Sequence, residues 1–266
     1  MTRKQRREQA RSNRAAIEKA AAERAAQRRR LRLSGIALAV CVVGILIVVI
    51  ASAGAGSVKK VAPQSREARG VAGEVTALLT GIPQSGNALG RQTAPVTLQY
   101  FGDLECPVCG AFTTSALPSI IRTWVRPGDL RIEYHSLETA TREPEQFQRQ
   151  QVAALAAGEQ DRLWNFVETF YHEQQEEGSG YVTESFIRGI AEQVPGLKLA
   201  SWAAQRGSTR LANELSSDAQ TANADSLNGT PAFLIGKSGR VMSRLEPRSF
   251  TEPTSFNEAI EKSLKA

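Results

Sequence analysis

The chain has 266 residues, of which 41% are hydrophobic, so it contains enough apolar sequence to bury a sizeable core. Its formal net charge is +6, but the first 32 residues hold twelve Lys or Arg against three Glu and account for +9. The remainder is therefore mildly acidic and lacks the positive excess typical of a nucleic-acid-binding surface. We expect no nucleic acid among the partners of this protein.

An apolar segment follows the basic residues. No charged residue occurs from Leu33 to Val58, and an uncharged, apolar run of this length is typical of a membrane-spanning helix. Positive charge before such a helix predicts that the N-terminus stays in the cytoplasm. We therefore expect a basic cytoplasmic arm over residues 1–32, a single transmembrane helix over residues 33–55 and an extracytoplasmic remainder. The small residues Ala51-Ser52-Ala53 leave a cleaved signal peptide as the alternative.

The sequence after the apolar run predicts a tether and then a strand that leads to two cysteines. Residues 56–73 are rich in small and charged side chains, which favours a flexible linker and places the globular domain over residues 74–266. Residues 95–101 alternate apolar and polar side chains, as a strand does, and lead into Cys106-Pro107-Val108-Cys109. Proline suits the first position of a helix, so we expect the cysteines to open a helix that is interrupted at Pro118.

The remaining elements complete an α/β domain. Residues 130–135 predict a second strand, and a strand, helix, strand unit is typical of parallel pairing. Apolar residues then recur at three- and four-residue spacing between about residues 143 and 227, which predicts a long helical insertion. Short strands over residues 232–235 and near 240–242, joined by a turn, and a helix over residues 255–264 close the domain.

The two cysteines of the Cys-x-x-Cys sequence are the candidates for chemistry. Cys41 lies in the apolar run and is expected to act as a small apolar residue. At a helix N-terminus, Cys106 would have its thiolate stabilised by the macrodipole, so we expect it to be the nucleophile, with Cys109 as the resolving thiol. A structural disulfide or half of a zinc site are the alternatives, although His135 and His172 lack zinc-finger spacing.

At these residues the sequence resembles the DsbA-like branch of the thioredoxin superfamily, which contains exported thiol-disulfide oxidoreductases. The resemblance implies a thioredoxin-like fold with a helical insertion, a cis-proline at Pro231 beside the cysteines, and pairing of the Thr230 backbone with an incoming peptide. It covers residues 82–266 and is carried by three stretches: Phe101-Gly102-Asp103-Leu104-Glu105-Cys106-Pro107-Val108-Cys109, Ala156-Ala157-Gly158-Glu159-Gln160-Asp161-Arg162-Leu163-Trp164 and Gly229-Thr230-Pro231.

The chain departs from the family pattern at two places. Family members that oxidise often have Pro-His between the cysteines, whereas Val108 cannot donate a side-chain hydrogen bond to a thiolate. Many thioredoxin-like proteins also bury an acid where this chain has Tyr100. Asp103 and Glu105 lie nearer the cysteines, and we expect them to be exposed loop acids, with proton transfer as the alternative.

The sequence thus predicts a membrane-anchored extracytoplasmic enzyme that oxidises the cysteines of exported polypeptides through Cys106 and Cys109, with Pro107 and Val108 tuning the pair. The resemblance implies reoxidation by a quinone-linked membrane partner. We expect no cofactor and no metal ion. Two alternatives stay open, namely a disulfide reductase or isomerase, and a non-enzymatic copper(I)-binding module that uses both thiolates as soft ligands.

Overall fold

The structure is a computed structural model that describes residue 63 and residues 65–266. The predicted arm over residues 1–32, the predicted transmembrane helix over residues 33–55 and most of the predicted tether lie outside these residues. Within the described part, every helix is too short or too polar to span a bilayer.

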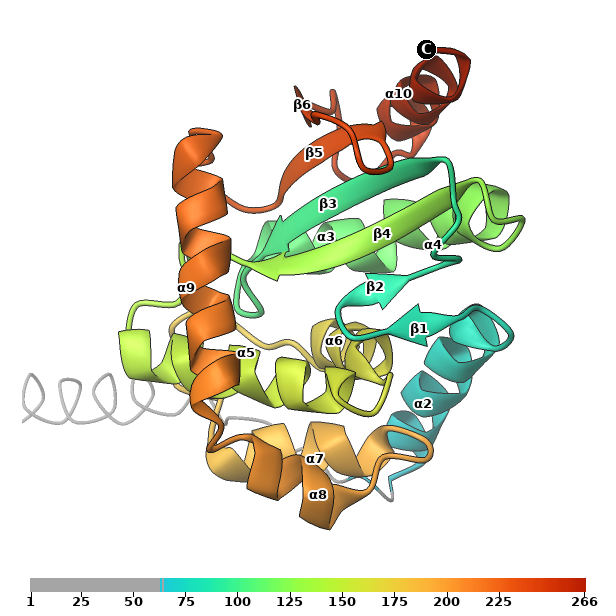
Figure 1. The fold of residues 1–266 in the computed structure, drawn as a ribbon. Helices are drawn as coiled ribbons and strands as arrows, with labels where there is room; N and C mark the ends of the chain where they lie inside the picture. The colour runs from blue at the N-terminus through green and yellow to red at the C-terminus, as the bar shows by residue number, and fades with distance from the viewer. Residues whose placement is uncertain (1–62, 64) are drawn as a thin grey trace, which may run out of the picture. The chain divides into compact units, whose positions relative to one another are not determined.

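A mixed six-stranded sheet forms the centre of the domain, in the order β1-β2-β4-β3-β5-β6 (Figure 1). β3 pairs in parallel with β4 and antiparallel with β5, so it lies in the middle of the sheet. Both faces of β3 are largely buried, and only Gln99 is partly exposed, as expected for a central strand that is covered on each side. The strands are β1 (Gln84–Ser85), β2 (Ala88–Leu89), β3 (Val96–Gly102), β4 (Leu130–Ser136), β5 (Ala232–Lys237) and β6 (Ser243–Leu245).

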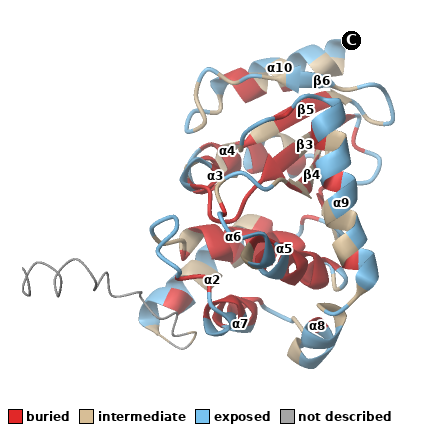
Figure 2. Cartoon of the chain, turned by 90° about the vertical axis from the view of Figure 1, so that its left-hand side faces the viewer, coloured by how far each residue is buried: buried red, intermediate tan, exposed pale blue. Residues whose placement is uncertain are grey.

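Helices cover the sheet and fill the region between β4 and β5, where the apolar spacing predicted them. Figure 2 shows wide buried surfaces on α5 and α6, whereas α9 carries a largely exposed face. Every residue of α6 from Leu163 to Tyr171 is buried, which is typical of a helix surrounded by others. The helices are α2 (Arg66–Leu79), α3 (Pro107–Thr114), α4 (Ala116–Ile120), a π-helical turn (Ile121–Val125), α5 (Pro144–Gly158), α6 (Leu163–His172), α7 (Glu184–Gln193), α8 (Leu199–Gln205), α9 (Thr209–Ala224) and α10 (Thr254–Lys265).

The start of the domain differs from the sequence prediction. Helix α2 begins at Arg66, so part of the tether predicted over residues 56–73 is helical and the domain does not start at residue 74. Ser65 caps this helix by accepting a hydrogen bond from the backbone N–H of Ala68, and Ala68 and Val75 are buried. Two glycines and several charged residues hid this apolar face in the sequence.

Two smaller differences concern short strands. The hairpin of β1 and β2 was not predicted, because strands of two residues are too short to show alternation. In the C-terminal hairpin, β5 extends to Lys237 and β6 begins at Ser243, three residues after the predicted start near residue 240. The turn between them therefore starts at Ser238 rather than at residue 236.

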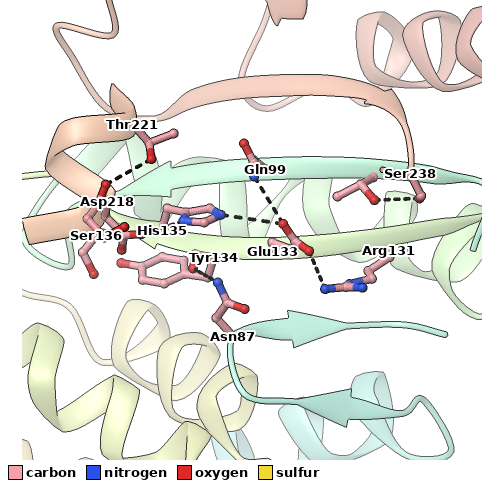
Figure 3. A network of polar contacts seen from close by, with 12 residues as sticks. Asn87, Gln99, Arg131, Glu133, Tyr134, His135, Ser136, Asp218, Thr221 and Ser238 are labelled. Atoms are coloured by element: carbon pink, nitrogen blue, oxygen red, sulfur yellow. Dashed lines mark hydrogen bonds and ion pairs between the residues drawn. The ribbon is translucent and has the colours of Figure 1, made fainter. Parts of the chain in front are cut away.

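A polar clamp, formed by His135 and Asp218, joins α9 to β4 (Figure 3). The Nδ1 atom of His135 lies 2.7 Å from Oδ1 of Asp218, whose Oδ2 accepts the backbone N–H of Ser136 at 2.8 Å. The His135 ring also stacks on Phe101, with 4.9 Å between the ring centroids. Burial lowers the pKa of His135, but the carboxylates of Asp218 and Glu133 outweigh this effect and raise the pKa to about 9. The clamp therefore fixes the helix that leads into the Gly229-Thr230-Pro231 loop.

Candidate active site

Both candidate cysteines lie where β3 passes into α3. Cys106 is the N-cap residue of α3 and Pro107 occupies the first helical turn, as the sequence predicted. Cys106 and Cys109 are buried and carry free thiols, and the backbone N–H of Cys109 donates to the Cys106 sulfur at 3.4 Å. Val108 lies between them with 40% of its surface exposed, so an apolar side chain borders the pair on the solvent side.

The surroundings of Cys106 favour its thiolate. A hydrogen bond from the Cys109 thiol contributes most to lowering the pKa of Cys106 to about 6, and burial opposes this effect. The side chain of Thr230 and the backbone N–H groups of Cys109 and Val108 lower the pKa further. Sequence reasoning anticipated the contribution of the helix N-terminus but not that of Thr230.

Cys109 has the opposite character. Burial raises the pKa of the Cys109 thiol well above its ordinary value, and the neighbouring Cys106 sulfur raises it further. Cys109 is therefore a protonated hydrogen-bond donor at neutral pH, whereas Cys106 is ionised. The two sulfurs share one proton unequally, which makes Cys106 the better nucleophile and the better leaving group of the pair.

The structure places Thr230 and Pro231 beside Cys106. The peptide bond between them is cis, and the carbonyl oxygen of Thr230 lies 3.3 Å from the Cys106 sulfur. Antiparallel pairing of β5 with β3, with Ala232 opposite Phe101, makes this possible although Cys106 and Thr230 are far apart in the sequence.

A pocket adjoins the cis peptide bond. It has a volume of about 260 Å³ and lies between the start of β5 and the segment that follows β6. Its lining is mixed, because apolar side chains such as Phe233, Leu245 and Phe250 alternate with Arg244 and Glu246. Such a surface can accept an extended polypeptide segment of mixed composition beside the reactive sulfur.

The two acids of the turn are buried, so the prediction that they are exposed loop acids was wrong. Asp103 is fully buried and accepts hydrogen bonds from the backbone of Glu105 and of residues 139–141. Glu105 is also buried, and its carboxylate accepts a hydrogen bond from Gln146. Burial, followed by the charge of Asp103, raises the pKa of Glu105. Both acids are covered by segments that lie distant in the sequence, which local patterns do not reveal.

Tyrosine side chains lie beneath the cysteines, where many family members bury an acid. The Tyr100 hydroxyl donates to that of Tyr171 at 3.3 Å, and Tyr171 donates to the Asp103 carbonyl at 3.1 Å. Burial raises the pKa of Tyr100, Tyr134 and Tyr171 well above the ordinary value, so these groups are neutral at physiological pH. Gly102 permits their convergence, since a Cβ atom there would lie 2.9 Å from the Tyr134 ring.

Gln174 is a residue of the site that the sequence did not reveal. Its Nε2 donates to the carbonyl oxygens of Leu104 and Cys106, at 2.9 and 3.1 Å. The segment after α6 is thereby tied to the turn that carries the cysteines. Gln174 lies in a stretch rich in Gln and Glu, where one amide side chain gives no distinctive signal.

Within residues 63 and 65–266, His, Cys, Asp and Glu side chains form no group of three or more that could hold a metal ion.

The sequence is similar to those of known proteins. A family model described as Thioredoxin matches residues 84–252. Disulfide bond formation protein D of Bacillus subtilis is 24% identical over 182 residues, which covers 66% of this chain and 76% of that protein.

Solved structures share the fold. Oxidised BdbD from Bacillus subtilis aligns with a TM-score of 0.58 and 21% identity, over 69% of this chain and 97% of that one. Alpha-DsbA1 from Wolbachia pipientis aligns with a TM-score of 0.56 and 16% identity, over 70% and 92%. The chain belongs to the thioredoxin family, and its fold is shared by BdbD and alpha-DsbA1.

Proposed function

We propose that this protein oxidises pairs of cysteines in exported polypeptides by transferring a disulfide from Cys106 and Cys109. The observation that carries the proposal is the setting of Cys106, whose sulfur lies at the N-terminus of α3 and 3.3 Å from the Thr230 carbonyl oxygen. The printed name of the Bacillus subtilis relative, a disulfide bond formation protein, supports the oxidising direction.

The reaction starts from the Cys106–Cys109 disulfide. A substrate thiolate attacks the Cys106 sulfur, a mixed disulfide forms, and the bond to Cys109 breaks. Cys109 leaves as a thiolate and takes up a proton, in keeping with its raised pKa. A second substrate thiolate then attacks the substrate sulfur of the mixed disulfide and releases Cys106 as a thiolate. Two electrons pass from the substrate to the pair, one substrate proton goes to Cys109 and the other to solvent.

The lowered pKa of Cys106 favours this direction in two ways. A thiol of low pKa leaves faster, which helps the second step. A stabilised thiolate also stabilises the reduced pair, so its disulfide becomes a stronger oxidant. At pH 7, lowering the pKa from its ordinary value to about 6 favours the reduced pair by about 1.4 kcal/mol, or about 30 mV.

Thr230 and Pro231 are proposed to guide the substrate. The Thr230 carbonyl faces the Cys106 sulfur, so a polypeptide whose backbone pairs with Thr230 would carry its own cysteine to Cys106. The adjoining pocket of about 260 Å³ is suited to a neighbouring substrate side chain. Pro107 and Val108 border the pair and would tune its reactivity.

The location that we propose is the outer face of a membrane. The basic residues before Leu33 and the uncharged run up to Val58 support a single-pass anchor with a cytoplasmic N-terminus. Disulfides persist in oxidising compartments outside the cytoplasm, which suits an oxidase. Regeneration of the Cys106–Cys109 disulfide requires an acceptor for two electrons, and we propose a quinone-linked membrane protein.

A trapping experiment tests the proposal. In the full chain, Cys109→Ser leaves Cys106 able to form a mixed disulfide that cannot resolve internally, so exported polypeptides should accumulate as covalent adducts. Adducts should disappear under reducing conditions and should be absent from the Cys106→Ser, Cys109→Ser double variant. Absence of adducts from the single variant would contradict the proposed function.

The second candidate is a reductase or isomerase, which Val108 favours because its side chain cannot stabilise a thiolate. The redox state of the pair in cells separates the two functions. An oxidase is held mainly as the disulfide, whereas a reductase is held mainly as the dithiol. Alkylation of free thiols immediately after acid quenching, followed by mass spectrometry of the Cys106–Cys109 peptide, measures this ratio.

A further inference from the structure

The carboxylate of Asp103 holds a loop that lies across the site from the cysteines. Its Oδ2 accepts the backbone N–H groups of Thr139, Ala140 and Thr141 at 3.0, 2.9 and 2.8 Å. Its Oδ1 accepts the Glu105 N–H at 3.1 Å and the Thr141 hydroxyl at 2.5 Å. Successive N–H groups that converge on one oxygen form an anion-binding nest, so loop 139–141 is built around a negative charge.

This loop reaches Thr230. The hydroxyl of Thr139 lies 2.5 Å from that of Thr230, while the Thr230 carbonyl contacts the Cys106 sulfur at 3.3 Å. Hydrogen bonding by the Thr230 side chain lowers the pKa of Cys106 and opposes the rise in the pKa of Cys109. A continuous set of hydrogen bonds therefore runs from Asp103 through Thr139 to Thr230.

Asp103 also fixes the other side of the site. Its carbonyl oxygen accepts the backbone N–H of Cys106 at 3.0 Å and the Tyr171 hydroxyl at 3.1 Å. The main chain of Asp103 thus positions Cys106, and its side chain positions the loop that contacts Thr230. One buried residue controls both borders of the space that an incoming sulfur must enter.

We propose that Asp103 is a positioning residue that sets the gap between Cys106 and Thr230 for a polypeptide substrate. This inference rests on the proposed function, because the gap matters only if a substrate cysteine enters it. It replaces proton transfer as the role of this acid. Both carboxylate oxygens of Asp103 accept hydrogen bonds from Glu105 and loop 139–141, so the side chain is engaged in holding this loop.

Two substitutions separate the steps of this path. Asp103→Asn keeps the size of the side chain, but its NH₂ group must face either the Glu105 N–H or the N–H groups of loop 139–141. Thr139→Val keeps the carboxylate and its partners and removes only the hydroxyl that contacts Thr230. Thr97→Val is the matched control, because it removes a comparable hydroxyl pair, with Ser238 at 2.7 Å, near the opposite end of β3.

The assay compares two reductants of the oxidised full chain. A synthetic peptide with two cysteines must align in the gap, whereas dithiothreitol is too small to need alignment. We expect Asp103→Asn to raise the half-saturating peptide concentration at least fivefold and Thr139→Val to raise it two- to fivefold. Maximal peptide rates and dithiothreitol rates should stay within twofold of the unmodified chain, and Thr97→Val should change neither.

The double variant tests whether the two residues act through one path. Its half-saturating concentration should match that of Asp103→Asn, because the contact of Thr139 with Thr230 is already lost. Three results would overturn the positioning role. They are an equal loss of rate with the peptide and with dithiothreitol, a half-saturating concentration in the double variant that is the product of the two single effects, and a half-saturating concentration that neither single variant changes. If Asp103→Asn does not fold, as judged by circular dichroism, Thr139→Val decides alone. If the unmodified chain oxidises no peptide, the proposed function fails first and the positioning role fails with it.

Discussion

The pKa of Cys106 should depend on the thiol of Cys109 more than on any other group. In the structure, the hydrogen bond from Cys109 is the largest contribution that lowers this pKa to about 6. Cys109→Ala removes the donor, and Cys109→Ser replaces it with a hydroxyl that can still donate. The two variants therefore differ in the hydrogen bond while both remove the second sulfur.

The expected change follows from the strength of such a bond. A hydrogen bond to a charged group contributes about 1.5–3 kcal/mol, and one pKa unit corresponds to about 1.36 kcal/mol. We expect the pKa of Cys106 to rise by about one to two units in Cys109→Ala. It should stay below the ordinary value of a thiol, because Thr230 and the backbone N–H groups at the start of α3 remain. In Cys109→Ser it should stay near 6.

Absorbance of the thiolate at 240 nm, followed from about pH 4 to pH 10, measures this pKa. Cys41→Ala should be included in every sample, so that Cys106 is the only cysteine that titrates. Identical pKa values in the Ala and Ser variants would refute the assignment to the hydrogen bond and would leave the helix N-terminus as the main cause. The expected difference also makes Cys109→Ser the better trapping variant, because its Cys106 stays ionised at neutral pH.

Three further predictions concern stability, measured by urea unfolding. Asp218→Asn should destabilise by about 2 kcal/mol at pH 6 and by less at pH 9.5. The reason is that the raised pKa of His135 adds stability below about pH 6.5, and this is lost as the pH rises through about 9. Gly110→Ala places a Cβ in steric conflict with Oε1 of Gln174. This substitution should lower the free energy of unfolding by about 1 kcal/mol. In a Gln174→Ala background the conflict is absent, and Gly110→Ala should then raise the free energy of unfolding by about 0.5–1 kcal/mol, because alanine favours a helix more than glycine does. Glu168 is fully buried and has no hydrogen-bond partner among the described residues, and burial raises its pKa to about 8. The cost of burying this carboxyl is therefore smallest below about pH 4.5, where it is protonated in both the folded and the unfolded chain, and grows as the pH rises towards 8. Glu168→Met should therefore stabilise by about 1–3 kcal/mol at pH 8 and by little at pH 4.5.

Local patterns predicted the elements that carry the cysteines. Alternation over residues 95–101 and a proline directly after Cys106 are signals contained within a few residues, and the structure has β3 and α3 at those places. The nearness of Thr230 to Cys106 was implied only by the family resemblance, because it depends on how β5 pairs with β3.

The burial of Asp103 could not be predicted in this way. An acid in a turn between a strand and a helix is usually solvated, and here it is covered by a loop from residues 139–141 whose N–H groups need an acceptor. Gln174 escaped notice for the same reason, since its partners are backbone carbonyls that are distant in the sequence. Hydrophobic periodicity reports which face of an element is buried, and it contains no information about such polar contacts.

The neutral tyrosines under Cys109 affect how long a mixed disulfide survives. Attack by Cys109 on the Cys106 sulfur would release a joined substrate unoxidised, and that attack requires Cys109 to lose its proton. Tyr100, Tyr134 and Tyr171 are poor bases, and burial keeps the Cys109 thiol protonated. If the chain oxidises its substrates as we propose, abortive release by Cys109 should therefore be slow, which would give the second substrate cysteine time to arrive.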